Sequence, residues 1–223
     1  MRKRTLCAGV ILTVLGMCMC RMDSQAVVSS AGGEILADQA VDTIKVAIPC
    51  NLSLGQYYQG GYIFYLDGSG CHGLVAARFD QSASAEWGCF GTLIGGTSTA
   101  IGTGQANTTA ILNGCATMDI AARLCDLLVL SGFNDWFLPS KDELNLMWEN
   151  LADTAGDNNT AGPSAPDNIG GFANGYYWSS TETNNDVAWR QPFYNGFQDF
   201  IIKRYNGKNG NYRVRAVRAV RAF

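Results

Sequence analysis

The sequence predicts an α+β domain, with two helices packed on antiparallel sheets, from three observations. The last third of the chain has aromatic and β-branched runs separated by polar Asn and Gly turns, the pattern of strands joined into a meander. Two stretches in the middle carry apolar residues at helical spacing. Cysteines recur after the apolar N-terminal run. We therefore expect a loop-rich, disulfide-stabilised domain.

The N-terminus has the pattern of an export signal. Basic residues 2–4 precede an apolar run from Leu6 to Cys20, and small or polar residues follow at 24–26. This apolar run is too short for a membrane span but fits a signal peptide. We predict a signal peptide over residues 1–26 and a secreted or cell-surface location.

The remaining chain divides near Pro49. Residues 27–55 are rich in small side chains and are interpreted as a leader or linker, and residues 56–223 as the folded domain. Cys18 and Cys20 offer an alternative to release, because an exported chain can be lipid-anchored through a cysteine that follows its apolar run. Membrane attachment is expected only in that case.

Composition excludes some classes of function. Of 223 residues, 47% are hydrophobic and 16% charged, and the net charge is −3. These values fit a globular chain and give no basic footprint for nucleic acid. Nine acidic residues and one basic residue lie between 134 and 186, whereas seven basic residues and no acidic one follow Asp199. We expect these regions to face each other; an exposed basic strip for anionic polysaccharide is the alternative.

The first half of the domain predicts a hairpin and a third strand. Gly60–Leu66 and His72–Ala77 flank a short Gly-containing turn. Ala85–Cys89 is interpreted as a strand beyond the next loop, and Gly91–Thr109 as loop because it is rich in Gly, Ser and Thr.

Five cysteines follow the signal region. The expected strand pairing would place Cys71 opposite Cys89, which favours a disulfide between them. Cys115 with Cys125, or Cys89 with Cys115, are the alternatives, and Cys50 is then the odd thiol. No spacing is Cys-x-x-Cys and the chain has one histidine, so no zinc site is expected.

Two helices are predicted in the middle of the chain. Leucines and isoleucine at helical spacing between Ile120 and Leu130 indicate the first, which Gly132 would end. Ser140 and Glu143 form a capping-box pattern that indicates the start of the second. Its apolar face is formed by Leu144, Met147, Trp148 and Leu151.

The last third predicts the meander. Its runs are Tyr176–Glu182, Val187–Tyr194, Phe200–Lys203 and Tyr212–Phe223. The Asn/Gly-rich stretch Asp153–Gly175 precedes it as a long loop, which we expect at the rim of a ligand surface.

Aromatic side chains mixed with polar ones near the turns indicate a recognition surface. Trp178 is expected in the core instead. The predicted ligand-binding residues are Trp189, Arg190, Gln191, Tyr194, Asn195, Phe197, Asp199, Arg204 and Tyr205.

No catalytic arrangement is predicted. Cys71 and His72 are adjacent, but neighbouring strand residues point to opposite faces. No metalloprotease, serine-hydrolase or phosphate-loop motif is present. We expect no metal or cofactor; calcium has no supporting motif, since Gln191-Pro192-Phe193 lacks the third ligand.

Several motifs, in order, resemble one family. They are Asp135–Leu144, Gly170–Phe172, Tyr177–Glu182 and Val217–Phe223. This set closely resembles the Lcl C-terminal domain family, named after the C-terminal domain of bacterial collagen-like adhesins, over about residues 60–223. The resemblance implies a C-type-lectin-like fold on an exported surface protein.

The prediction for function is a non-catalytic, exported adhesin-like module that binds an extracellular glycan or protein through its C-terminal sheet and loops. The alternatives are an assembly domain of a surface appendage and a retroelement-diversified variable receptor, whose varied face would be residues 184–211. An enzyme ranks last, because the similar formylglycine-generating enzymes need cysteines in the C-terminal part, and none follows Cys125.

Overall fold

The computed structural model describes residues 50–156, 162, 164–204, 212–213 and 217–221. The α+β class is confirmed. The helices are α1 (Gly104–Gly114), α2 (Ala121–Asp126) and α3 (Lys141–Met147), which continues as the π-helix η1 (Trp148–Ala152). The strands are β1 (Tyr57–Tyr58), β2 (Gly61–Leu66), β3 (His72–Ala77), β4 (Tyr176–Glu182), β5 (Val187–Pro192), β6 (Asp199–Ile202), β7 (Tyr212–Arg213) and β8 (Val217–Arg221).

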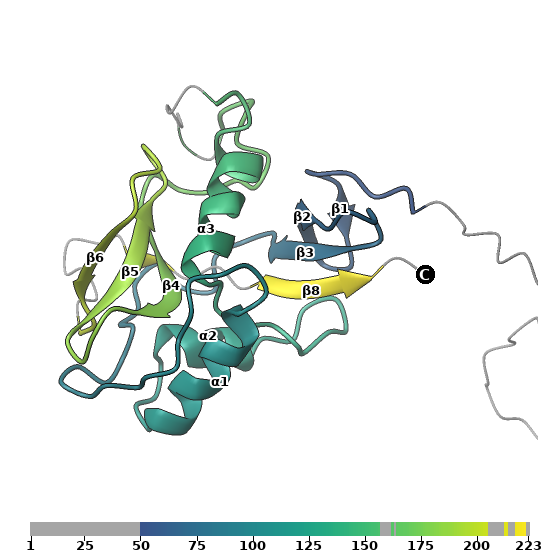
Figure 1. Cartoon of the computed structure of the whole chain (residues 1–223). Helices are drawn as coiled ribbons and strands as arrows, with labels where there is room; N and C mark the ends of the chain where they lie inside the picture. Colours follow the sequence, from purple (N-terminus) through teal and green to yellow (C-terminus); the bar gives the residue numbers. More distant parts are fainter. Residues whose placement is uncertain (1–49, 157–161, 163, 205–211, 214–216, 222–223) are drawn as a thin grey trace, which may run out of the picture. The chain divides into compact units, whose positions relative to one another are not determined.

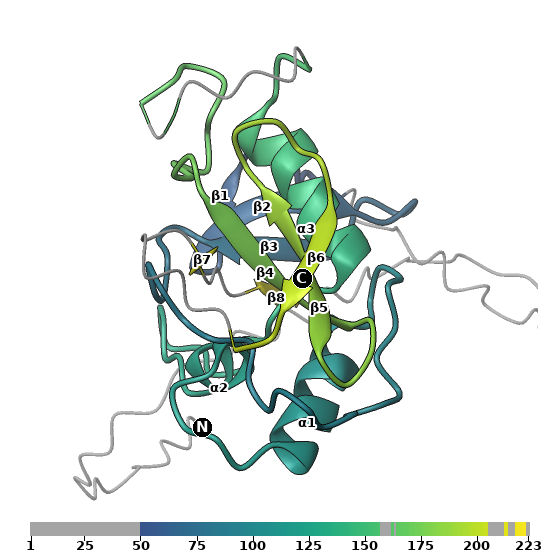
Figure 2. The same cartoon turned by 90° about the vertical axis from the view of Figure 1, so that its left-hand side faces the viewer.

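The strands form two sheets, with the orders β1-β2-β3-β8 and β6-β5-β4-β7. Helix α3 contacts β2 of the first sheet and both β4 and β5 of the second (Figure 1). The second sheet contains the predicted meander, because β4, β5 and β6 pair antiparallel in sequence order and lie side by side in Figure 2.

The sequence predicted that the meander continues to the end of the chain. In the structure it ends with β6. Strand β7 pairs parallel with β4, and β8 leaves for the first sheet, where it pairs antiparallel with β3. Residues 73–77 of β3 are all buried, so backbone groups on both edges of β3 need partners. Strand β2 supplies these hydrogen-bond partners along one edge of β3, and β8 supplies them along the other.

The second predicted helix is confirmed at its start. The Ser140 hydroxyl accepts from the Glu143 N–H, and the Glu143 carboxylate accepts from the Ser140 N–H, which completes the capping box. The predicted apolar face is buried at each of its positions: Leu144, Met147, Trp148 and Leu151.

Other elements differ from the prediction. Helix α1 was missed, and α2 is shorter than the expected Ile120–Leu130. Ala85–Cys89 is not a strand. Its backbone makes separate hydrogen bonds instead: Trp87 N–H donates to the Lys203 carbonyl, and the Glu86 carbonyl accepts from Ala121. None of the helices in the described part of the chain has the length and apolar character that a membrane span needs.

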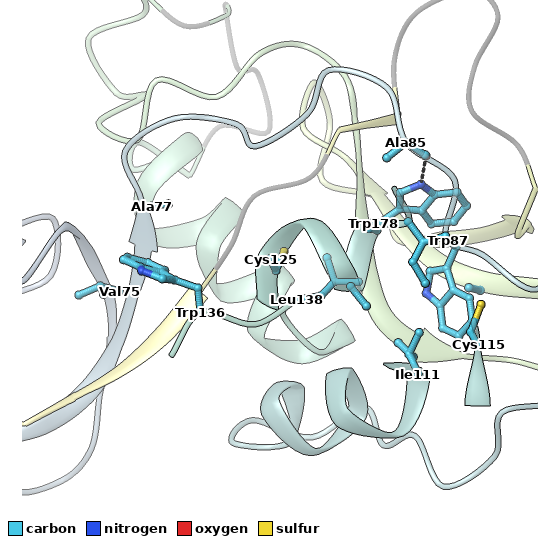
Figure 3. Packing of buried hydrophobic residues seen from close by; sticks show 14 of the residues in the cluster. Val75, Ala77, Ala85, Trp87, Ile111, Cys115, Cys125, Trp136, Leu138 and Trp178 are labelled. Carbon is cyan, nitrogen blue, oxygen red and sulfur yellow. Dashed lines mark hydrogen bonds between the residues drawn. The ribbon is translucent and has the colours of Figure 1, made fainter. Parts of the chain in front are cut away.

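Large aromatic side chains fill the core between these elements (Figure 3). Trp178 is fully buried, as predicted, and its indole N–H donates to the Ala85 carbonyl at 2.8 Å. Trp87 is also fully buried and donates to the Ser179 carbonyl at 2.8 Å. These two indoles therefore each retain a hydrogen bond, which removes most of the cost of burying them.

The disulfides correct the favoured pairing. Cys50 bonds to Cys71 and Cys89 to Cys115, with Cα–Cα distances of 5.0 and 5.7 Å. The Cys71–Cys89 prediction is wrong because Ala85–Cys89 does not pair with β3. The alternative Cys89–Cys115 is confirmed. Among the described residues the free thiol is the buried Cys125 of α2, not Cys50.

One ion pair joins the acidic and basic regions. Lys203 Nζ bonds the Glu182 carboxylate, donates to the Thr92 carbonyl at 2.8 Å and lies 4.7 Å from the Trp87 ring centroid. Both charged side chains are almost completely buried. The expectation that the two regions face each other is confirmed for this pair.

Candidate functional site

The predicted binding residues lie mainly on the β5–β6 hairpin, but on two opposite faces of it. Cross-strand partners share a face of a sheet. Trp189 opposes Phe200, whereas Arg190 opposes Asp199 and Trp178. The structure therefore separates Trp189 from Arg190 and Asp199, which the sequence had grouped together.

On one face, Arg190 is held in a network. Its guanidinium donates to both carboxylate oxygens of Asp199 at 2.6 and 2.9 Å and stacks 3.9 Å from the Tyr176 ring centroid. The Tyr176 and Tyr194 hydroxyls lie 2.8 Å apart. This hydrogen bond, and to a smaller extent burial, raises the pKa of the Tyr194 phenol above its ordinary value. Arg190 is buried, so the most exposed members of this network are Asp199 and Tyr194.

Gln191 is beneath the surface, and its expected place on an exposed face is wrong. It is 0% exposed. Its amide nitrogen donates to Asn145 Oδ1 and to the Gly196 carbonyl, both at 2.9 Å, and its oxygen accepts from Gln198 Nε2 at 3.2 Å. Because its polar atoms are used internally, Gln191 ties the turn after β5 to helix α3.

The other face of the hairpin carries exposed apolar side chains. On this face Phe200 is 53% exposed, and Phe197, which lies in the turn after β5, is 79% exposed. Phe200 packs edge-to-face on half-buried Trp189 at 5.4 Å, and Lys141 Nζ lies 4.8 Å from the Trp189 ring centroid. We call Trp189, Phe197, Phe200 and Ile202 the hairpin surface.

Sequence reasoning missed Phe200 and Ile202. Their signal was the two-residue period of a strand: Phe200 and Ile202 are exposed, whereas Ile201 between them packs against the core. The segment Phe200–Ile202 is apolar throughout, so its sequence does not show which side chains are exposed. That depends on its pairing with β5, where Phe200 lies opposite Trp189.

Two predicted residues lie elsewhere. Arg204 is exposed, and its guanidinium lies 4.5 Å from the Phe90 ring centroid. Phe90 belongs to the loop before α1, so Arg204 extends away from the turn after β5. Tyr205 lies outside the described residues.

A hollow of about 270 Å³ opens beside the hairpin surface, between the turn after β5 and helix α3. We call it the turn hollow, and it is lined by Asn145, Trp148, Asn195, Gly196, Phe197 and Gln198. Gly196 has φ +71°, and a Cβ atom built there would lie 2.5 Å from the Trp148 ring. The close approach of turn and indole therefore requires glycine.

The described residues contain no cluster of metal-ligating side chains. No group of three or more metal-ligating His, Cys, Asp or Glu side chains occurs among them. Cys71 is in a disulfide, so it cannot form a thiol–imidazole pair with His72. His72 Nδ1 instead lies 3.2 Å from Asp67 Oδ2 at the exposed β2–β3 turn, where Ser69 also bonds Asp67.

These features define a disulfide-linked α+β domain that displays aromatic side chains on a firmly held hairpin. The model of the Lcl C-terminal domain family matches residues 81–218, and the chain belongs to this family. The predicted resemblance is thereby confirmed, over a somewhat shorter range than expected. No curated protein matches the chain with significant similarity.

Proposed function

We propose that the chain is an exported, non-catalytic binding module of the adhesin type, at the cell surface or secreted. It recognises an extracellular glycan or protein through the hairpin surface and the neighbouring turn hollow. Membership of the Lcl C-terminal domain family and the signal-like N-terminus support this proposal. We further propose that the domain has a C-type-lectin-like fold, needs no cofactor, and meets no nucleic acid.

The single observation that carries the proposal is the exposure of Phe197 and Phe200 on a rigid base. Burying a phenylalanine side chain contributes about 1.5–3 kcal/mol. A partner that covers both rings could therefore gain several kcal/mol of binding free energy. Gln191 and Gln198 hold the turn by partly buried hydrogen bonds, so little further ordering is needed when a partner binds. Exposed apolar area on a pre-formed base is characteristic of recognition surfaces.

Binding also needs directional groups, because two aromatic rings alone do not offset the association cost of about 4–15 kcal/mol. The amide side chains of Asn195 and Gln198 provide them next to Phe197. Lys141 adds a cation at the Trp189 side of the surface. The combination of rings, amides and one cation suits a polar, partly apolar ligand.

The test is binding of the purified chain to a glycan array and to a panel of matrix proteins. The variant Phe197→Ala/Phe200→Ala should lose at least about tenfold in affinity for whatever ligand is found, since loss of 1.4 kcal/mol is tenfold. The matched control is Leu127→Ala, which removes a 67% exposed apolar side chain at the end of α2. Equal binding by both variants would show that the hairpin surface is not the site.

An assembly domain of a surface appendage is the second candidate. The observation that favours it is the position of β6 at the edge of its sheet, where among the described residues it pairs only with β5. An edge strand that exposes Phe200 and Ile202 can accept a further strand from a protein partner. Co-purification with envelope proteins, together with failure to bind any glycan or matrix protein, would favour this function instead.

A further inference from the structure

The turn hollow offers polar atoms that the protein itself does not use. Asn195 Oδ1 accepts from the Phe197 N–H at 3.2 Å, which fixes the amide orientation and leaves its Nδ2 without a partner among the described residues. Gln198 Nε2 donates to the Lys141 carbonyl at 2.7 Å and to Gln191 Oε1 at 3.2 Å. Gln198 Oε1 therefore remains as an acceptor. Asn195 and Gln198, which carry this donor and this acceptor, both line the hollow.

We propose that the turn hollow binds one uncharged sugar residue, an inference that rests on the proposed binding function. Asn195 Nδ2 would donate to one hydroxyl and Gln198 Oε1 would accept from another, since a hydroxyl group can do either. The Phe197 ring, 79% exposed at the rim, would cover the apolar C–H face of the sugar.

The lining chemistry excludes a charged ligand group as the preferred occupant. All six lining residues are uncharged, so no side chain there would neutralise a carboxylate or sulfate taken out of water. Asn145 is already engaged with Gln191 and with Glu149, to which it donates at 2.8 Å. Because Glu149 is bonded to a lining residue of the hollow, its negative charge further disfavours an anionic ligand.

The size and construction of the hollow favour a sugar over an extended peptide. Its volume of about 270 Å³ is below the usual range for drug-sized pockets, roughly 300–1,000 Å³. It is formed by side-chain amides from a turn and a helix, not by a row of backbone groups that would pair with a strand. A single ring with two or three hydroxyls matches both features.

Trp148 provides a spectroscopic reporter at the base of the hollow. It is 7% exposed, its indole N–H has no acceptor in the described structure, and its ring lies directly beneath Gly196. Trp87 and Trp178 belong to a different core cluster, separate from that of Trp148. The indole N–H resonance of Trp148 should therefore respond to an occupant, whereas those of Trp87 and Trp178 should not.

The experiment titrates the ¹⁵N-labelled chain with methyl glycosides of glucose, galactose, mannose and N-acetylglucosamine, and with glucuronic acid. Trp148→Phe assigns the reporter resonance. At least one neutral glycoside should shift the Trp148 resonance saturably, and glucuronic acid should bind at least about tenfold more weakly. Saturable binding of glucuronic acid alone, or no saturable shift with any sugar, would overturn the inference.

Matched isosteric variants test the atoms named. Asn195→Asp keeps the oxygen that accepts from Phe197 and removes the free donor, so sugar affinity should fall at least about tenfold with the unfolding midpoint unchanged. Asn184→Asp makes the same change in the β4–β5 turn, where the side-chain oxygen accepts from Asp186 and Val187, and should not alter sugar binding. Equal sugar affinity in both variants would refute the site.

The two proposals can fail separately. If Phe197→Ala/Phe200→Ala abolishes binding of a matrix protein while no glycoside reaches Trp148, the sugar assignment is wrong and the binding function stands. If an extended peptide, and no sugar, shifts the Trp148 resonance and loses affinity in Asn195→Asp, the occupant is a protein segment instead.

Discussion

The two turns of the meander contain similar residues but differ in what they present. In the β4–β5 turn, Asn184 Oδ1 accepts from two backbone N–H groups, and the Asn185 carbonyl accepts from Gly91. The β5–β6 turn uses Asn195 in the same way but places Phe197 in solvent. The first turn connects strands and anchors a loop, whereas the second also displays an aromatic side chain.

What lies beneath each turn explains the difference. Near the β4–β5 turn, the Glu182 carboxylate accepts from Ile94 and Gly95 and pairs with Lys203, which binds a loop tightly to the sheet. Beneath the β5–β6 turn, Gln191 joins the turn to α3 through neutral hydrogen bonds. Polar groups hold both turns in place, and the second turn also exposes the Phe197 side chain.

The largest effect on stability is expected at the base of the β4–β5 turn. Glu182→Gln leaves Lys203 buried without its counter-charge, which should lower the free energy of unfolding by about 3–5 kcal/mol. Glu149→Gln, on the exposed side of η1, is the control and should change it by less than about 0.5 kcal/mol. Urea unfolding measures both, and a similar loss in the two variants would contradict a structural role specific to Glu182.

The glycine of the β5–β6 turn should be the next most sensitive position. Gly196→Ala combines a positive φ with a Cβ that meets the Trp148 ring, so a loss of roughly 3 kcal/mol is expected. Gly132→Ala has a similar φ of +82° but meets nothing within 4 Å, and should lose only about 1–2 kcal/mol. Thermal unfolding of both variants separates the cost of the positive φ from the cost of the contact with Trp148. Equal losses would mean that the Trp148 ring moves aside without cost.

Removing the link between turn and helix should cost less stability and more binding. Gln191→Leu removes one partner each from Asn145 Oδ1, the Gly196 carbonyl and Gln198 Nε2, for a loss of about 1–3 kcal/mol. Ligand affinity should fall as well, because the turn is no longer held in one orientation. Calorimetric titration beside urea unfolding checks both, and unchanged affinity would show that the turn needs no support from Gln191.

The buried Glu143, in the first turn of α3, predicts that the stability of the fold depends on pH. Burial raises the pKa of Glu143 above its ordinary value of 4.5, although N–H groups of Ser140, Gly102 and Gly104 favour the ionised form. The folded chain thus holds this proton more tightly than the unfolded chain. Its contribution to stability is complete below pH 4.5 and is lost as pH rises through the raised pKa.

Glu143→Gln does not titrate, so the stability gap between wild type and variant should shrink as pH rises above 4.5. Urea unfolding between pH 4 and pH 8 measures that gap. A gap that widens with rising pH would mean that the three N–H donors outweigh burial.

The elements that local sequence determines were predictable. Ser140 and Glu143 identified the start of α3, and aromatic runs between polar turns identified β4 and β5. Helix α1 was not predictable in this way, because its Gly, Asn and Thr residues are weak helix formers. Long-range hydrogen bonds hold it instead, including Asn107 to Ser180 and Thr108 to Leu138.

The site was predicted in outline and not in detail. Phe197 and Asn195 were found because Asn195-Gly196 marks a turn. The burial of Gln191 could not be inferred from β5 alone, since it depends on Asn145 from a distant helix. The same reason explains the disulfides: Cys89 lies opposite Cys115 because of α1, an element that the sequence pattern did not indicate.

The most direct measurement compares Phe197→Ala with Leu127→Ala for both ligand affinity and the free energy of unfolding. Phe197 is 79% exposed, so its removal should change the unfolding free energy by less than about 0.5 kcal/mol. Affinity for the ligand found on the array should nevertheless fall about tenfold or more, and Leu127→Ala should retain it. Full affinity in Phe197→Ala would contradict recognition at the β5–β6 turn.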